Sequence, residues 1–445
     1  MKILFISLGC DKNLADSEEM LGLLTGSGHE IVDSEEDADA IVINTCCFIH
    51  DAKEESVNTI LEMAEYKKTG KCKALIVTGC MAQRYKEEIT QEIPEVDAVL
   101  GTTSYGDIVK ALNEAQAGHV FQEFRDINEL PEDSGRRVLT TGGHFGYLKI
   151  AEGCDKHCTY CIIPSLRGKF RSVPEERLLA QAEYMASQGV KELILVAQET
   201  TVYGIDLYGK KTLHILLKKL CQIKGIRWIR VLYCYPEEIY DELIQVMKEE
   251  KKICNYLDLP IQHASDRILK RMGRRTTRKQ LEDIIAKLRR EIPDIVLRTS
   301  LITGFPGETQ EDHEELMEFV DEMEFDRLGV FTYSPEEGTP AETMEGQVPE
   351  EVKEERRDEL MSLQQEISLE KGDERIGQEL LVMIEGKVSG ESAYIARTYA
   401  DAPKVDGYIF VQTGELLVTG DFARVRVTGA LEYDLIGELA DEYTE

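Results

Sequence analysis

Three cysteines spaced C-x-x-x-C-x-x-C constrain this chain more than any other feature of its sequence. They stand in Cys154-Asp-Lys-His-Cys158-Thr-Tyr-Cys161, directly after the apolar run Tyr147–Ala151, and we call them the loop triad. A structural zinc site takes four ligands, commonly from two C-x-x-C pairs; no second pair lies nearby, and His157 would be a sterically tight fourth. Three cysteines on a 4Fe-4S cluster leave one iron open to hold and reduce a small molecule. The spacing therefore favours a cluster over zinc.

Six apolar runs, each separated from the next by room for a helix, form the middle of the chain. They are Tyr147–Ala151, Glu192–Ala197, Trp228–Leu232, Tyr256–Pro260, Val296–Ile302 and Arg327–Thr332. This alternation predicts a (β/α) barrel, complete or partial, with the loop triad after its first strand. Residues 349–371 then form one highly charged helical stretch.

Residues 1–125 also alternate between apolar runs and helical patterns. The runs are Lys2–Leu8, Ala40–Ile43, Ala74–Val77 and Ala98–Leu100, and helical patterns include Ser17–Leu24 and Asp51–Tyr66. Near-continuous apolar strands between helices predict a parallel, Rossmann-like sheet covered on both faces.

A second set of cysteines follows three of these predicted strands. Cys10 ends Ile-Ser-Leu-Gly-Cys, Cys46 ends Val-Ile-Asn-Thr-Cys, and Cys80 ends Ile-Val-Thr-Gly-Cys; we call them the strand-end triad. Carboxyl ends of parallel strands meet at one edge of a sheet, where ligands bind in open α/β folds. A cysteine can also be merely a small buried hydrophobe, which suits Cys72, Cys221 and Cys254 better. Three in succession predict a second three-thiolate cluster.

The C-terminal part reads as a small all-β module. Short strands are expected at Glu379–Gly386, Ala393–Thr398, Gly407–Gln412 and Phe422–Thr428. The chain is thus an α/β multidomain protein: an N-terminal domain (1–125), a linker (126–145), a central barrel domain (146–372) and a β module (373–445).

Charge narrows the range of partners. Lys plus Arg is 52 and Asp plus Glu is 84, for a net charge of −32; residues 1–125 carry −12 and residues 373–445 carry −9. A phosphate backbone requires clustered cations, and no segment supplies a surplus, so nucleic acid is disfavoured as a direct substrate. Opposite fields steer encounter, which makes a basic protein the better partner.

The same sequence indicates where the protein works. No stretch approaches the ~18 consecutive apolar residues of a membrane-spanning helix. The apolar stretch before Gly9 is also shorter than that of a signal peptide. Eleven cysteines are an odd number in a large chain, so we expect thiols or metal ligands in a reducing cytoplasm, with no membrane association.

Together, the two triads and the C-terminal β module resemble the methylthiotransferase family of radical S-adenosylmethionine (SAM) enzymes, over nearly the whole chain. The resemblance implies that the loop triad ligates a SAM-binding 4Fe-4S cluster and the strand-end triad an auxiliary 4Fe-4S cluster. Tyr160 stands where the family usually has an aromatic residue before the last cysteine, and would contact SAM. The C-terminal module would be a TRAM domain, an OB-like barrel that recognises the substrate.

The resemblance also implies a mechanism. An electron from the SAM-binding cluster would cleave SAM to a 5′-deoxyadenosyl radical, which abstracts hydrogen from an unactivated carbon. The auxiliary cluster would hold the added sulfur, and a second SAM would supply the methyl group. No catalytic side chain is then expected beyond the cluster ligands, and an unidentified electron donor is needed.

Several motifs resemble the RimO branch of the family, which methylthiolates the β-carbon of an aspartate in the small-subunit ribosomal protein S-twelve. Besides Gly9–Ser17, they are Tyr233-Cys-Tyr-Pro-Glu-Glu238, Gln262-His-Ala-Ser-Asp266, Tyr333-Ser-Pro-Glu-Glu-Gly-Thr-Pro340 and Ala396–Gly407. Three positions depart from the usual pattern. Asp11 replaces a Pro, Glu199 replaces an Asp, and Cys47 follows Cys46 where Gly is common, which leaves open which of these two thiols is the ligand.

Two other functions are alternatives. A MiaB-like or MtaB-like enzyme would use the same chemistry on tRNA adenosine, which the acidic C-terminal module disfavours. A non-catalytic iron–sulfur or zinc protein would cleave no SAM.

Two groups of charged residues carry further expectations. Asp401, Asp406 and Glu415 lie in or beside predicted loops of the C-terminal module, where we expect an acidic recognition surface. The four arginines of the run Arg271–Arg278 are expected to form a solvated helix end.

Overall fold

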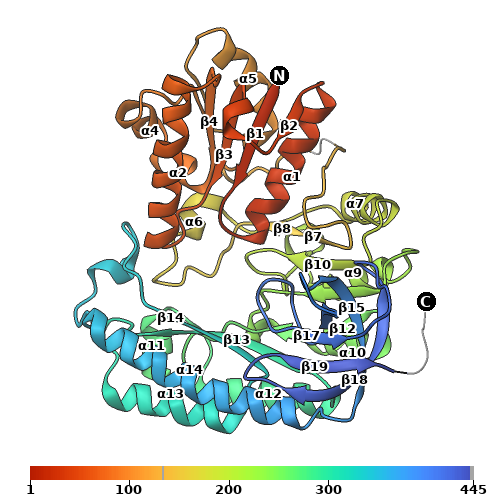
Figure 1. The fold of residues 1–445 in the computed structure, drawn as a ribbon. Helices are drawn as coiled ribbons and strands as arrows, with labels where there is room; N and C mark the ends of the chain where they lie inside the picture. The colour runs from red at the N-terminus through yellow and green to blue at the C-terminus, as the bar shows by residue number, and fades with distance from the viewer. Residues whose placement is uncertain (133–134, 441–445) are drawn as a thin grey trace.

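The computed structural model describes residues 1–132 and 135–440, and its first sheet is built from residues near the N-terminus (Figure 1). This sheet has six parallel strands in the order β2-β1-β3-β4-β5-β6. They are β1 (Lys2–Ser7), β2 (Glu30–Val32), β3 (Ala40–Thr45), β4 (Ala74–Gly79), β5 (Ala98–Leu100) and β6 (Phe121–Glu123). The four predicted strands are confirmed. The sequence pattern missed β2 and β6, because three-residue edge strands carry too little apolar pattern to be recognised.

Helices cover both faces of this sheet, as the apolar strands predicted. Ile41 and Ile43 pack on one face with residues of α2 and α3, whereas Ala40 and Val42 pack on the other with α1 and α5. The helices of this part are α1 (Asp11–Gly26), α2 (His50–Thr69), α3 (Cys80–Tyr85), α4 (Glu87–Glu92) and α5 (Ile108–Gln116), with short 3₁₀ turns at Glu35–Asp37 and Tyr105–Asp107.

The central sheet confirms the predicted partial (β/α) barrel. Its six strands are all parallel, in the order β7-β10-β11-β12-β13-β14, so β7 and β14 are its edges. They are β7 (Phe145–Lys149), β10 (Glu192–Val196), β11 (Trp228–Val231), β12 (Ile253–Asp258), β13 (Val296–Thr303) and β14 (Arg327–Thr332). A two-stranded antiparallel pair, β8 (Ala151–Glu152) and β9 (Arg171–Ser172), flanks the loop triad.

Helices pack on one face of the central sheet and form the largest apolar core. They include α7 (Glu175–Ser187), α9 (Leu213–Leu220), α10 (Asp241–Glu249), α12 (Arg278–Glu291), α13 (Gln310–Met323) and the long α14 (Glu350–Asp373). Shorter segments are α6 (Ile163–Arg167), α8 (Ile205–Tyr208), α11 (Asp266–Arg271) and 3₁₀ turns at Pro236–Glu238 and Pro340–Thr343.

The C-terminal module is a closed five-stranded barrel in the order β15-β16-β17-β19-β18. Its strands are β15 (Glu379–Lys387), β16 (Ala393–Thr398), β17 (Ile409–Gln412), β18 (Phe422–Ala430) and β19 (Leu435–Leu439). The first four were predicted. The fifth, β19, was missed, although closure of the barrel depends on it.

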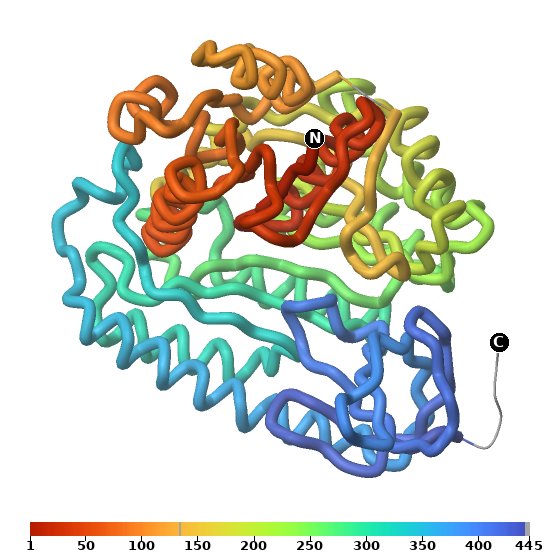
Figure 2. Tube along the Cα trace, turned by 45° about the horizontal axis from the view of Figure 1, so that its top comes forward, coloured from red at the N-terminus to blue at the C-terminus, as the bar shows by residue number. Residues whose placement is uncertain are grey.

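The N-terminal part and the C-terminal barrel lie on the same face of the central sheet, opposite its helices (Figure 2). Met383 and Phe422 of the C-terminal barrel pack there against Trp228 and Tyr256, and Leu14 of α1 packs on the same cluster. No helix among the described residues is long and apolar enough to cross a membrane.

Two of the three expected recognition carboxylates are buried in this arrangement. Asp401, which is 2% exposed, pairs with Arg327, and Asp406 accepts a hydrogen bond from the Tyr256 hydroxyl at 2.7 Å. The Arg298 guanidinium also lies 3.4 Å from Asp406. The expectation of a recognition surface is therefore wrong for Asp401 and Asp406, which join the barrel to the central sheet; Glu415 is exposed.

Candidate active site: two cysteine triads

The strand-end triad is brought together at one edge of the N-terminal sheet. Cys10, Cys46 and Cys80 come after the neighbouring strands β1, β3 and β4. Burial, together with the neighbouring thiols of Cys80 and Cys10, raises the pKa of Cys46 to about 12. The three strand ends are neighbours in the sheet, and their binding of one cluster stays a prediction.

Two glycines allow this close approach. Gly9 has φ +87° and Gly79 has φ +93°, a left-handed backbone that only glycine adopts freely. A Cβ on Gly9 would lie 2.9 Å from the Cys46 Sγ, and a Cβ on Gly79 would lie 2.3 Å from the Asn44 Oδ1. Cys10 and Cys80 are thus each preceded by a glycine that turns the chain sharply.

Polar side chains hold the strand ends in register beneath the triad. The Asn13 Nδ2 donates to the carbonyls of Leu8 (3.1 Å) and Thr45 (2.8 Å), which joins the ends of β1 and β3. The Arg167 guanidinium donates to the Asn13 Oδ1 at 2.5 Å and lies 3.5 Å from the Cys80 Sγ. Burial raises the pKa of Cys80, and the positive charge of Arg167 opposes that rise. The sequence analysis did not identify Asn13 or Arg167.

The loop triad follows β8 and is held by backbone hydrogen bonds from several elements. The Cys154 amide donates to the Gly168 carbonyl (3.1 Å), and the Thr159 amide donates to the Met272 carbonyl (2.9 Å). Burial raises the pKa of Cys154 to about 11 and that of Cys161 to about 12, and in both cases the Cys158 thiol adds to the rise. Thiols with such pKa values stay protonated until a bound metal supplies positive charge.

The geometry favours clusters over single ions. Within residues 1–132 and 135–440, no three His, Cys, Asp or Glu side chains lie close enough together to hold one metal ion. A zinc ion holds every ligand at about 2.0–2.3 Å, whereas in a 4Fe-4S cluster each cysteine binds a different iron, which spreads the thiolates apart. His157 is exposed, so it does not complete a zinc site with the loop triad. What each triad offers a 4Fe-4S cluster is its donor chemistry, three cysteine thiols.

Aromatic and basic side chains surround the loop triad. Tyr160 packs edge-on against Phe305, with ring centroids 6.4 Å apart. The Tyr235 hydroxyl lies 3.9 Å from the Cys158 Sγ, and the Arg274 guanidinium lies 4.4 Å from the centroid of the Tyr235 ring. Tyr235 belongs to a motif that the sequence analysis quoted without assigning a role.

Arg274 corrects the expectation of a solvated helix end. It is only 7% exposed, and its guanidinium donates to the Pro260 carbonyl at 2.8 Å. Arg271 donates to the Pro306 and Glu345 carbonyls, and Arg278 pairs with several carboxylates, including those of Glu318 and Glu322 on α13. Arg275 alone of the four is exposed, because the chain folds the other three against neighbouring segments.

Glu199 is a buried carboxylate close to the loop triad. Its side chain is 2% exposed, and one carboxylate oxygen lies 4.0 Å from the Lys156 Nζ. Burial raises the pKa of Glu199 to about 7, although the Lys156 charge opposes this rise. The charge of Glu199 contributes to the raised pKa of Cys154, so this position acts on the loop triad electrostatically.

One short segment contacts the loop triad and the residue next to Cys10. At Tyr233 the chain has φ +59°, and the Tyr233 hydroxyl lies 3.5 Å from the Asp11 Oδ2, beside Cys10. Two residues later, the Tyr235 hydroxyl lies 3.9 Å from the Cys158 Sγ of the loop triad. The first turn of α1 and the loop triad are therefore both reached from this one segment.

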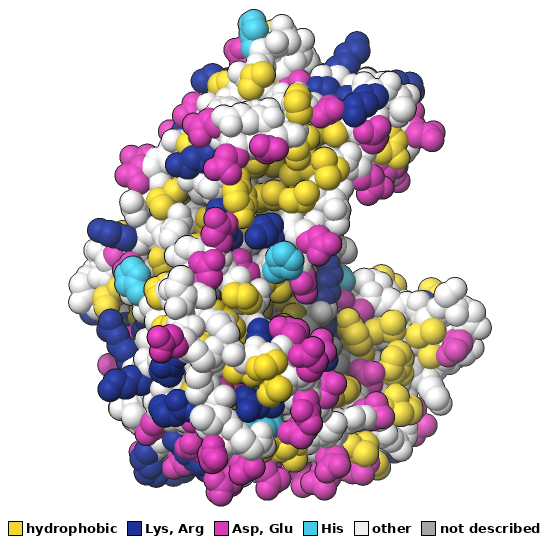
Figure 3. Space-filling model, turned by 90° about the vertical axis from the view of Figure 1, so that its left-hand side faces the viewer, with side chains coloured by type: hydrophobic (Ala, Val, Ile, Leu, Met, Phe, Trp, Pro, Cys, Tyr) yellow, Lys and Arg dark blue, Asp and Glu magenta, His cyan; other side chains and the backbone are white. Residues whose placement is uncertain are grey.

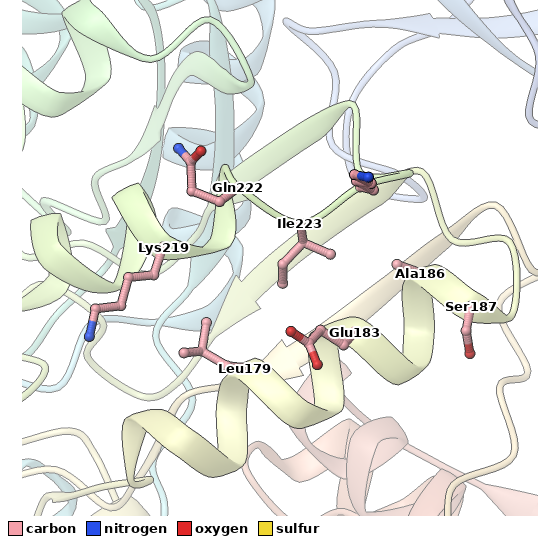
Figure 4. Close-up of a pocket in the computed structure, with 8 residues that line it drawn as sticks. Leu179, Glu183, Ala186, Ser187, Lys219, Gln222 and Ile223 are labelled. Carbon is pink, nitrogen blue, oxygen red and sulfur yellow. The ribbon is translucent and has the colours of Figure 1, made fainter.

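One open pocket lies away from the cysteine triads. A cavity of about 570 Å³ is open between α7 and α9, with Leu179, Glu183, Lys219 and Ile223 among its lining residues (Figure 4). It contains no member of either triad, so it belongs to the outer helical layer rather than to the cysteine sites.

Comparison with known families divides the chain into three matched stretches. Residues 2–101 match an uncharacterised protein family, UPF0004. Residues 148–320 match the radical SAM superfamily, and residues 376–440 match the TRAM domain.

Curated relatives match over almost the full length. A protein of Lachnoclostridium phytofermentans is 64% identical over 98% of this chain and 99% of its own length. Relatives in Pelotomaculum thermopropionicum and Clostridium botulinum are 52% and 50% identical, over 98% and 100% of this chain and 99% of their own lengths. All three bear the name ribosomal protein uS12 methylthiotransferase RimO.

Two solved structures share the fold at low sequence identity. The radical SAM methyltransferase TsrM of Kitasatospora setae, with cobalamin and a 4Fe-4S cluster bound, has a TM-score of 0.54 at 12% identity, over 77% of each chain. The cobalamin-dependent SAM radical enzyme OxsB has a TM-score of 0.52 at 16% identity, over 82% of this chain and 56% of its own.

Proposed function

The chain belongs to the RimO family of ribosomal protein uS12 methylthiotransferases, and on that premise we propose that it adds a methylthio group to the β-carbon of an aspartate in uS12, the small-subunit protein S-twelve. The observation that carries the proposal is the segment Tyr233–Tyr235, which contacts Cys158 of the loop triad and Asp11, the neighbour of Cys10. A substrate bound at this segment would be near both sets of cysteines.

We assign the ligands accordingly. The loop triad, Cys154, Cys158 and Cys161, would hold the SAM-binding 4Fe-4S cluster, with Tyr160 beside it for SAM. The strand-end triad, Cys10, Cys46 and Cys80, would hold the auxiliary 4Fe-4S cluster. When bound, the two clusters supply the electron that cleaves SAM to a 5′-deoxyadenosyl radical and the sulfur that is added.

The chain's own side chains position these groups and exclude water. Asn13 and Arg167 hold the edge of the N-terminal sheet, and Arg167 belongs to α6, which follows the loop triad directly. Arg167 also pairs with Asp16 of α1 at 2.8 Å, so one helix end joins the two sites. A buried pair of this kind is costly to break, which favours a fixed separation between the triads.

The protein's setting is also part of the proposal. An external electron donor is required, because SAM cleavage consumes an electron. A reducing cytoplasm fits the eleven free cysteines, all of which lie in the described part of the chain. The proposed division is into residues 1–125, 126–145, 146–372 and 373–445, and β7 begins at the last residue of the linker, Phe145.

Mass spectrometry of ribosomal proteins and of tRNA nucleosides, from cells with and without this gene, tests the substrate. We expect uS12 to lose the mass of one methylthio group when the gene is absent, with tRNA nucleosides unchanged. Loss of a methylthiolated adenosine instead, with uS12 unchanged, would assign the chain to the tRNA-modifying branch.

Metal analysis tests the two centres separately. Anaerobically reconstituted protein should hold about eight irons per chain, or two 4Fe-4S clusters. Replacement of the whole loop triad by Ala should leave about half of the iron in the strand-end site. Zinc in place of iron, or loss of all iron from that variant, would contradict two independent clusters.

A further inference from the structure

Lys12 is a buried cation at the edge of the N-terminal sheet. It lies in the first turn of α1, two residues after Cys10, and is only 8% exposed. Its Nζ lies 3.3 Å from the centroid of the ring of Tyr233, a residue that follows β11 of the central sheet. The amine therefore faces the central domain and not its own domain.

Lys12 differs from the other buried cations around it because it has no carboxylate partner. Lys149 pairs with Asp16 and Glu152, Arg167 pairs with Asp16, and Arg137 pairs with Glu18. Among the described residues, no carboxylate oxygen lies within 4.0 Å of the Lys12 Nζ, including that of its neighbour Asp11. Its closest partner is Tyr233, whereas the Asp11 carboxylate and the Cys10 thiol act on the amine electrostatically without a salt bridge.

The location of Lys12 indicates what its partner is. A substrate must reach the space between the triads, and the molecular surface is hollowed between its upper part and the lobe at the lower right of Figure 3. The substrate of the proposed reaction is an aspartate side chain, which carries a negative charge next to the carbon that reacts. A cation without a carboxylate of its own complements that charge.

We propose that Lys12 binds the carboxylate of the substrate aspartate and so selects an acidic side chain for modification. This inference rests on the proposed function. The β-carbon is bonded directly to the carboxyl carbon, so an ammonium group that fixes the carboxylate also fixes the reacting carbon between the two triads. The face of the Tyr233 ring contacts the amine. Lys12 is then a specificity-determining residue.

A cation so close to Cys10 could instead stabilise the negative charge of the auxiliary cluster. The contacts of Lys12 favour its role in binding the substrate carboxylate over this alternative. The Lys12 Nζ forms no hydrogen bond with a thiol in the described part of the chain, whereas Arg167 already supplies a positive charge to Cys80 at 3.5 Å. The Lys12 amine lies at the edge of the N-terminal sheet, in contact with Tyr233 of the central domain.

A double-mutant cycle between enzyme and substrate tests the proposal. Binding of uS12, and of uS12 with its target aspartate changed to Asn, is measured anaerobically on the reconstituted wild-type enzyme and on Lys12→Met. We expect the wild-type enzyme to bind the Asp form at least about ten-fold more tightly than the Asn form, because the Asn form loses the charge-assisted hydrogen bond with Lys12. Lys12→Met should bind both forms with equal, weaker affinity, and Lys12→Arg should restore part of the preference.

The control is Lys73→Met, which removes one positive charge at the opposite end of β4, where Lys73 is exposed. It should keep the wild-type preference. If Lys12→Met still prefers the Asp form of uS12 over the Asn form, the proposal is overturned. If, in addition, the electron paramagnetic resonance spectrum of the auxiliary cluster is altered in that variant, Lys12 is assigned to the cluster. If wild-type enzyme leaves uS12 unmodified, the proposed function itself is wrong, so the two failures are distinguishable.

Discussion

At the scale of single residues, two adjacent cysteines have different surroundings. Cys46 lies beside Gly9, and its backbone is fixed by Ser56, whose hydroxyl donates to the Cys46 carbonyl at 2.7 Å. Cys47 is fully buried in the apolar layer between the sheet and α2, near Ile60. Strand β3 ends before both cysteines, and the Cys80 thiol contributes to the raised pKa of each, so Cys46 as the ligand stays a prediction.

Single substitutions separate the two thiols. Cys46→Ala should lose the auxiliary cluster and about half of the iron. Cys47→Ala should keep the iron and lower the free energy of unfolding by roughly 1 kcal/mol, because it leaves a small cavity. Iron analysis and thermal unfolding measure the two effects. If Cys47→Ala loses half of the iron while Cys46→Ala keeps it, the ligand is Cys47.

At the scale of elements, the junction between β4 and α3 shows how a strand end is shaped for its cysteine. The strand ends at Gly79, and α3 begins at once with Cys80. A Cβ on Gly79 would lie 2.3 Å from the Asn44 Oδ1 and 2.5 Å from the Thr45 carbonyl oxygen, so the neighbouring strand end leaves no space for a side chain.

Gly79→Ala should therefore displace Cys80 and remove about half of the bound iron, while the loop triad keeps its share. Gly28→Ala is the matched control, since Gly28 has φ +85° but no atom within 4 Å of its added Cβ. That variant should lose only about 1–2 kcal/mol through backbone strain and keep all of its iron. Equal iron loss in both variants would mean that strain, and not the close approach of strand ends, controls the site.

At the scale of the whole molecule, a buried charge network joins the C-terminal barrel to the central sheet. Glu192 of β10 accepts from Arg230 at 2.8 Å and from Arg397 of β16 at 2.7 Å, and all three side chains are fully buried. Despite its burial, Glu192 has a pKa below its ordinary value of 4.5, because the Arg397 and Arg230 charges stabilise the carboxylate.

Removal of the central charge should weaken this interface strongly. Glu192→Gln leaves Arg230 without a carboxylate and Arg397 with Glu385 alone, and should cost about 3–5 kcal/mol, detected as a lower Tm and faster proteolysis between the domains. Glu379→Gln is the control, since its pair with Arg426 is largely exposed and worth about 1 kcal/mol or less. Because the pKa of Glu192 is lowered, the wild-type stabilisation is complete above about pH 4.5 and decreases below it. Equal Tm values for the two variants would contradict this account.

Two neighbouring loops of the C-terminal barrel carry exposed carboxylates that a basic partner could contact. The Thr413 amide donates to the Ser392 carbonyl at 3.1 Å, which brings the loops that carry Glu391 and Glu415 together. Both carboxylates are exposed, unlike Asp401 and Asp406. Opposite charge at such a surface increases the rate of association with a basic protein.

Reversal of both charges, Glu391→Lys with Glu415→Lys, should slow association with uS12 about ten-fold at low salt and less at 0.15 M, where the Debye length is about 8 Å. Stopped-flow binding measures the rate. Glu88→Lys with Glu92→Lys on α4 changes the net charge equally and should have a smaller effect, since those exposed residues lie in the N-terminal part. An equal effect of both pairs would assign the steering to overall charge.

The chain's local chemistry was sufficient to identify its six proposed ligands and its inner strands. A cluster requires cysteines at short, regular spacings or at successive strand ends, and strands buried on both faces must be apolar throughout, so these features are written in neighbouring residues. Strand length limits this reasoning for β2 and β6, which have three residues each, whereas β19, with five, was recognised only in the closed barrel.

Long-range pairing decided the rest. From the sequence alone, Asp401, Asp406 and Arg274 are expected to be surface charges. Only folding places Asp401 beside Arg327, which is 74 residues away in the sequence. Likewise Lys12 meets Tyr233 across the domain interface, and Arg167 meets Cys80 across 87 residues. A local pattern records whether a residue is apolar or charged, but the partner that makes burial of a charge tolerable comes from a distant segment, and that partner exists only in the folded chain.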